Sequence, residues 1–77
     1  MDIKKKRLWV LDVYFYSKYD VPHFVKVAQE LGVNPEDIDI RTMDQIHRVM
    51  ITTNYKSILK LKRKLKNYLT RSIDIRR

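Results

Sequence analysis

The segment from Asn54 to Leu69, NYKSILKLKRKLKNYL, limits the possible folds of this chain more than any other stretch. Most positions between its apolar residues are Lys or Arg, and the apolar residues recur every three or four positions, at Ile58, Leu61, Leu65 and Leu69. This spacing predicts one amphipathic helix, because residues three and four apart share a helix face. The apolar face must then cover a core, whereas the basic face must meet water or an anion.

Four other stretches are predicted strands: the first is rich in β-branched and aromatic residues, and the others alternate between an apolar and a more polar side. They are 7–16, 38–41, 46–53 and 70–77. Alternate residues of a strand point to opposite sides of the sheet, so one set in each strand should face the core. That inward set is Trp9, Leu11, Val13, Phe15, Ile38, Ile40, Val49, Ile51, Ile73 and Ile75.

A first helix is expected between the first two strands. Asp20 is the predicted N-cap, and Pro22 is tolerated in the first turn, where no internal hydrogen bond is lost. The apolar rhythm then runs through Val21, Phe24, Val27, Ala28 and Leu31, and Gly32 is suited to a left-handed C-cap. Asn54 is the predicted N-cap of the basic helix, and residues 43–45 are the predicted turn between the middle strands.

The resulting order of elements, βαββαβ, predicts an α+β ferredoxin-like sandwich. Right-handed crossovers give an antiparallel sheet in the order 4-1-3-2, with both helices on one face. At 77 residues the chain is expected to form one domain, residues 1–77. In this topology three basic segments should meet at one end of the sheet: Lys4 to Arg7, Arg76 with Arg77, and the start of the basic helix. They could form an anion site there or simply be solvated chain ends.

The net charge of +8 comes from 17 basic and 9 acidic side chains, and it favours a polyanionic partner. No acidic residue lies between Tyr55 and Leu69, so no ion pair within the helix offsets the repulsion there. A membrane partner is not expected, because the leucines of that helix are needed for the core. The absence of cysteine favours a reducing, cytoplasmic environment.

The sheet face without helices is expected to carry exposed tyrosines and arginines, as in RNA-binding sheets that stack bases on rings and hold phosphates with cations. We therefore expect a small basic module that binds nucleic acid, RNA or DNA. The candidate contact residues are Tyr14, Tyr16, Arg41, Arg48, Lys56, Lys60, Arg63, Lys64 and Arg76. The same face would equally suit a homodimer interface, and its Tyr and Thr residues could simply reflect β-propensity.

No catalytic site is predicted, and we expect neither a metal nor another cofactor. The only histidines, His23 and His47, have no metal-ligand spacing and are interpreted as an exposed pair. A glycine-rich phosphate loop cannot be formed around Gly32, the single glycine, and no serine has a recognisable base beside it.

Two short motifs resemble the ACT regulatory domain, notably that of acetolactate synthase small subunits. Asp20 and Pro22 match its D-x-P-G turn, with His23 at the glycine position, and Gly32 and Asn34 match its G-[IV]-N exit from the first helix. The resemblance covers most of the chain after Tyr16. It implies a ferredoxin-like fold and a dimerisation or regulatory module, whose copies pair side by side and bind a small ligand or a partner protein.

Overall fold

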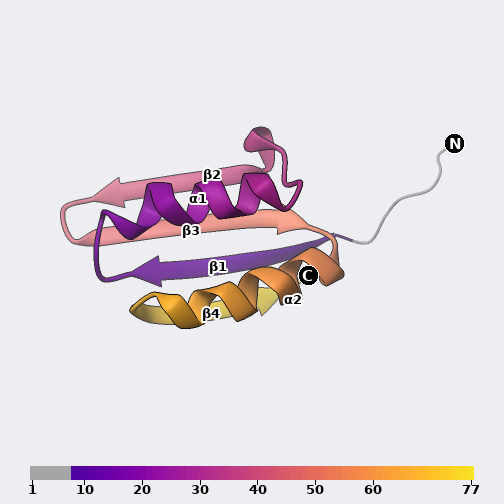
Figure 1. The fold of residues 1–77 in the computed structure, drawn as a ribbon. Helices are drawn as coiled ribbons and strands as arrows, with labels where there is room; N and C mark the ends of the chain where they lie inside the picture. Colours follow the sequence, from indigo (N-terminus) through magenta and orange to yellow (C-terminus); the bar gives the residue numbers. More distant parts are fainter. Residues whose placement is uncertain (1–7) are drawn as a thin grey trace, which may run out of the picture.

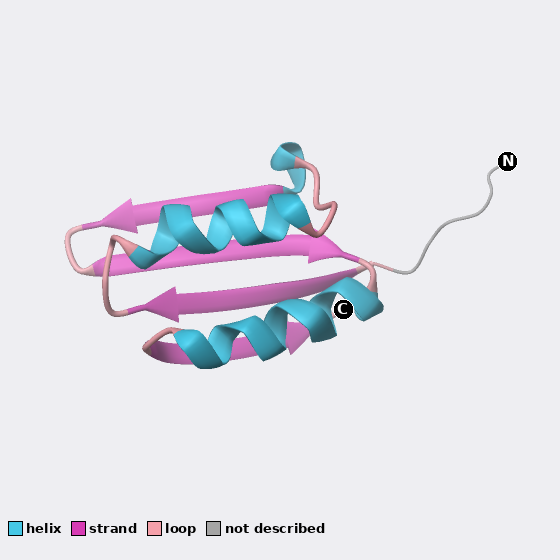
Figure 2. Ribbon diagram, viewed as in Figure 1, coloured by secondary structure: helices cyan, strands magenta, loops and turns pink. Residues whose placement is uncertain are grey.

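The computed structural model describes residues 8–77, which form a layer of two helices over one sheet (Figures 1 and 2). The elements follow the predicted βαββαβ order: β1 (Trp9–Phe15), α1 (Asp20–Glu30), β2 (Ile38–Met43), β3 (Ile46–Thr53), α2 (Tyr55–Lys64) and β4 (Thr70–Arg76). Two short 3-10 turns, η1 (Pro35–Asp37) and η2 (Leu65–Asn67), precede β2 and β4. The four strands are antiparallel in the order β2-β3-β1-β4, which confirms the ferredoxin-like topology.

The core lies between the sheet and the two helices, and strand parity correctly predicts which residues build it. In the central strands Leu11 pairs with Ile51 and Val13 with Val49, and all four side chains are fully buried. Phe24 and Ala28 of α1 and Ile58 and Leu61 of α2 cover them from the helix layer. Inward residues of the edge strands are less covered: Ile40 and Ile73 stay partly exposed because the helices lie over the middle of the sheet.

The predicted single helix to Leu69 is wrong at its C-terminal end. The α-helix ends at Lys64, η2 follows, and Leu69 is 74% exposed outside the core. Tyr68 adopts an extended conformation, and its ring packs edge-on against Phe15 and Phe24, at centroid distances of 5.6 Å. The chain must straighten here because β4 begins at Thr70, so Tyr68 takes the place in the core that the helical pattern gave to Leu69.

The predicted cap of α2 is confirmed, whereas that of α1 is wrong. Asn54 Oδ1 accepts a hydrogen bond of 2.9 Å from the Ser57 amide, as an N-cap should. In α1 the N-cap is Tyr19, which already has helical dihedral angles, so Asp20 is the first helical residue. Within residues 8–77, no side chain caps this helix. Gly32 has φ of 97°, the left-handed conformation expected after the helix.

The middle hairpin is longer than predicted, because Met43 belongs to β2 and pairs with Ile46 of β3. The turn is therefore shorter, and Asp44 has φ of 48°, a conformation that Asp tolerates better than most residues. The predicted anion site at the opposite end of the sheet includes Lys4 to Arg7, which lie outside the described residues.

Candidate nucleic-acid interface

Asp12 lies at the centre of the open face, the side of the sheet without helices, and two arginines cover it. Arg48 donates from Nε and Nη2 to the two carboxylate oxygens of Asp12, at 2.9 and 2.8 Å. Arg76 Nη1 donates to Asp12 Oδ2 at 3.2 Å and to Asp74 Oδ2 at 2.8 Å. Because Asp12 and Asp74 are cross-strand neighbours, Arg76 offsets a repulsion between like charges.

Asp12 is only 5% exposed, so its charge depends on these partners. The hydrogen bonds from Arg48, aided by Arg76, lower the pKa of the Asp12 carboxyl despite the opposing effect of burial. Two of the predicted phosphate contacts, Arg48 and Arg76, are thus already engaged with carboxylates.

The third predicted arginine of this face, Arg41, also has an acidic neighbour. Its Nε lies 3.3 Å from Asp39 Oδ2, and both side chains are exposed. The three arginines that strand parity places on the open face, Arg41, Arg48 and Arg76, therefore each pair with an aspartate of that face (Asp12, Asp39 or Asp74). These pairs make the three arginines less available to a polyanion than strand parity alone indicates.

The two predicted stacking tyrosines have different surroundings. The Arg48 Cζ atom lies 5.1 Å from the centroid of the Tyr14 ring, which is half-buried. Tyr16 is 62% exposed, and Arg71 Cζ lies 5.8 Å from its ring centroid. Arg71 also lines a shallow hollow of about 320 Å³ with Tyr14 and Ser72.

Sequence reasoning did not select Arg71, because strict alternation gives it the same parity as Ile73. The register of β1 with β4 shifts between Tyr14 and Phe15, and this irregularity falls beside Arg71. A bulge cannot be read from alternation, and no other signal in the sequence marks this one.

The basic side chains of α2 and η2 form the most highly charged surface of the described chain. Lys56, Lys60 and Lys64 recur every four residues as one row, which we call the lysine row. Lys62, Arg63 and Lys66 form a second set beside β4, which we call the groove set. All six are exposed, and none forms an ion pair with another residue in 8–77.

Part of this charge has a structural role. Lys62, Arg63 and Lys64 lie in the last turn of α2, where cations interact favourably with the negative end of the helix dipole. The lysine row also extends to the first turn, where a cation faces the positive end of the dipole. The dipole alone therefore does not account for Lys56 and Lys60.

At the end of the sheet where α2 begins, the described residues pack against one another. The rings of Trp9 and Tyr55 lie 4.6 Å apart between centroids, and Arg77 Cζ lies 5.3 Å from the Trp9 ring. Arg76 instead donates a hydrogen bond to Asp12, and the Asn54 side chain accepts one from the Ser57 amide. The described part of the predicted anion site therefore brings Arg77, but not Arg76, to the start of α2.

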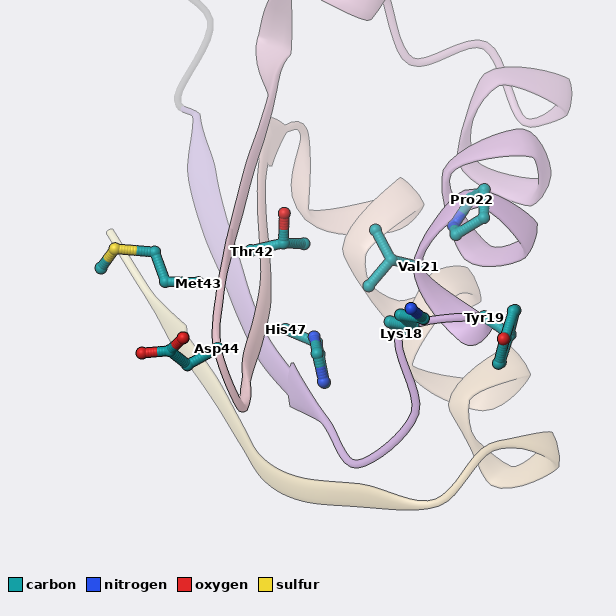
Figure 3. Close-up of a pocket in the computed structure, with 8 residues that line it drawn as sticks. All are labelled: Lys18, Tyr19, Val21, Pro22, Thr42, Met43, Asp44 and His47. Atoms are coloured by element: carbon teal, nitrogen blue, oxygen red, sulfur yellow. The ribbon is translucent and has the colours of Figure 1, made fainter.

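The histidines lie in separate environments and do not form the expected exposed pair. His23 Nδ1 lies 2.6 Å from the Tyr68 hydroxyl. His47 is half-buried, and its Nδ1 has no hydrogen-bond partner among residues 8–77. It lines a pocket of about 450 Å³ between the start of α1 and the β2–β3 turn, together with Lys18, Tyr19, Val21, Pro22, Thr42, Met43 and Asp44 (Figure 3).

Residues 8–77 contain no cluster of three or more His, Asp or Glu side chains that could hold a metal ion. In the same range, no helix combines the length and the apolar character needed to cross a bilayer.

Comparisons of the chain with protein-family models, curated proteins and solved structures gave no match. The chain shares the βαββαβ topology of the ACT domain, and no comparison identifies it as a member of that family.

Proposed function

We propose that this protein binds nucleic acid, that the lysine row of α2 makes the main phosphate contacts and that the groove set adds to the positive field around it. The supporting observation is that six exposed cations on this surface have no ion-pair partner in residues 8–77. Cations without protein partners are available to replace the counterions of a phosphate backbone. On the open face Arg41, Arg48 and Arg76 are paired with aspartates, so these three arginines contribute less than the sequence predicts.

Tyr16 is the better placed of the two tyrosines to stack on a base. Its ring is exposed, whereas Tyr14 packs beside an arginine that is held by Asp12. The Tyr16 amide also donates to the Leu69 carbonyl at 3.4 Å, which places this tyrosine beside the segment that follows η2. A single strand that follows the cations of α2 past Lys66 would reach Arg71 and Tyr16 at this end of the sheet.

Titration against labelled single-stranded and duplex oligonucleotides tests the proposal. We expect binding at low salt that weakens steeply as salt is raised, because phosphate contacts release counterions. A single strand should bind more tightly than a duplex of equal length, since only its bases are free to stack on Tyr16. Negligible binding at low salt would refute the proposal.

A second candidate function is an ACT-like dimerisation module, and the edge of β2, which pairs only with β3 among residues 8–77, supports it. Asp39 and Arg41 stand on either side of Ile40, which is 47% exposed. If β2 paired antiparallel with β2 of a second copy about Ile40, each Asp39 would lie opposite Arg41 of the other copy. Two ion pairs and an Ile40 contact would then join the sheets, with the His47 pocket close to the junction.

The mass in solution and a charge exchange test this second candidate. We expect Arg41→Asp to weaken such a dimer, because it places like charges opposite each other. The double variant Asp39→Arg with Arg41→Asp should restore the dimer, since the exchanged charges again face opposite partners. A monomer at high micromolar concentration, or a dimer that neither variant affects, would exclude pairing through β2.

A further inference from the structure

A groove lined by aliphatic and cationic side chains lies between α2 with η2 and β4. Its volume is about 430 Å³, and its lining consists of Leu59, Lys62, Arg63, Leu65, Lys66 and Ile73. Leu59, Lys62 and Arg63 share one side of α2, since they are three or four residues apart, and Lys66 follows them in η2. Ile73 is 39% exposed, so an apolar side chain of β4 remains open to a partner.

The groove borders a free edge of the sheet. β4 is the outermost strand, and its only strand neighbour in the described chain is β1. Its other side therefore presents backbone N–H and C=O groups to which a further strand can bind. Ile73 pairs with Val13, a fully buried core residue, so Ile73 points to the helix side, where the groove lies.

We propose that this edge binds an extended acidic peptide, which adds to the sheet as a fifth strand beside β4. Backbone hydrogen bonds along β4 supply affinity, and side chains that point into the groove supply specificity. An apolar side chain of the peptide contacts Ile73 and Leu59. Acidic side chains two positions before and after it lie on the same side of the strand and reach the groove set. The preferred sequence is acidic-x-apolar-x-acidic.

The chemistry of the groove favours this occupant over two others. A stacked nucleobase fits less well, because none of the six lining residues is aromatic. A second copy of the chain would bring two groove sets together, and their like charges would repel. An acidic peptide neutralises Lys62, Arg63 and Lys66 and covers the exposed part of Ile73.

Fluorescence anisotropy with a labelled peptide centred on Glu-Thr-Val-Thr-Glu tests the proposal. We expect saturable binding that weakens at least about tenfold when both Glu residues become Lys, or when Val becomes Ser. N-methylation of alternate peptide amides on the side that pairs with β4 should also abolish binding, because it removes donors to the strand edge. Equal binding by the methylated peptide, or no binding by the parent peptide, would overturn the proposal.

Protein variants locate the site. Ile73→Asp should weaken peptide binding by about tenfold, and Lys62→Glu with Lys66→Glu should reverse the preference toward the Lys peptide. The matched control, Lys56→Glu with Lys60→Glu, changes the same charge on the lysine row and should alter peptide affinity by less than about threefold. Circular dichroism of each variant verifies folding. A larger effect of the control pair, or an oligonucleotide whose binding depends on Ile73, would overturn the assignment of the groove to a peptide.

Discussion

Arg48 on β3 holds the buried carboxylate of Asp12 on β1 with two hydrogen bonds, of 2.9 and 2.8 Å. The two residues are 36 positions apart in the sequence, and their strands are direct neighbours. At the centre of the open face, this pair therefore serves to stabilise the fold. Because Arg48 is engaged in this pair, the main candidate surface for a polyanion is α2, and not the open face of the sheet.

Removal of the Asp12 charge should destabilise the fold. We expect Asp12→Asn to lower the free energy of unfolding by about 2 kcal/mol, the scale of hydrogen bonds to a charged group. The matched control is Asp39→Asn, since Asp39 pairs with Arg41 on the exposed surface; its effect should stay within about 0.5 kcal/mol. Urea denaturation measures both variants, and equal effects would contradict the structural role of Asp12.

The same pair predicts a loss of stability in acid. Because the folded state lowers the pKa of Asp12, its contribution is present above the unfolded value, about 3.9, and is lost as pH falls through the lower folded value. Arg48→Met removes the main cause of this lowering and brings the folded pKa of Asp12 closer to the unfolded value, so the acid-dependent loss of stability attributable to Asp12 should become smaller. Unfolding free energies measured between about pH 2 and 6 test this. An acid-dependent loss that Arg48→Met reduces no more than Arg41→Met does would contradict it.

Because α2 ends at Lys64, two leucines that share its helical spacing in the sequence, Leu61 and Leu69, should differ in their contribution to stability. Leu61→Ala should cost about 2 to 5 kcal/mol of unfolding free energy, because this side chain is fully buried. Leu69→Ala should cost less than about 0.5 kcal/mol, since Leu69 is exposed. Thermal or chemical denaturation of both variants measures the difference. Comparable costs would mean that the helix continues to Leu69, as the periodicity alone suggests.

Local periodicity was sufficient to predict the order of elements, the inward residues of the central strands and the cap at Asn54. Periodicity failed where the conformation or burial of a residue depends on the rest of the fold. Tyr68 replaces Leu69 in the core because β4 begins at Thr70, two residues after Tyr68, and the chain has to straighten before it. Asp20 is not the cap because the turn before it is already helical at Tyr19.

The candidate site was less predictable, because its properties depend on pairing across strands. Alternation placed Asp12, Arg48 and Arg76 on one face, but only the register of three strands brings them into contact. Arg71 was missed because its position depends on a bulge. The exposed cations of α2 were the easiest to predict, since a helical pattern with no acidic residue defines them directly.

Base stacking on Tyr16 gives a prediction specific to single strands. Tyr16→Ala should weaken single-stranded binding by about 1 to 3 kcal/mol and leave duplex binding nearly unchanged. Tyr19→Ala is the matched control, because Tyr19 is also an exposed tyrosine but lies at the start of α1. Fluorescence titrations compare the two variants. Equal losses in both, or no loss in Tyr16→Ala, would remove stacking on Tyr16 from the proposal.

The salt dependence of oligonucleotide binding tests the central proposal most directly, when wild type is compared with the variant Lys56→Gln, Lys60→Gln, Lys64→Gln. Each phosphate contact contributes about 0.7 to the slope of log K against log salt for a single strand. We therefore predict that the triple variant binds more weakly and that the magnitude of its slope falls by about 2. An unchanged affinity and slope in a folded triple variant would contradict the assignment of phosphate contacts to the lysine row.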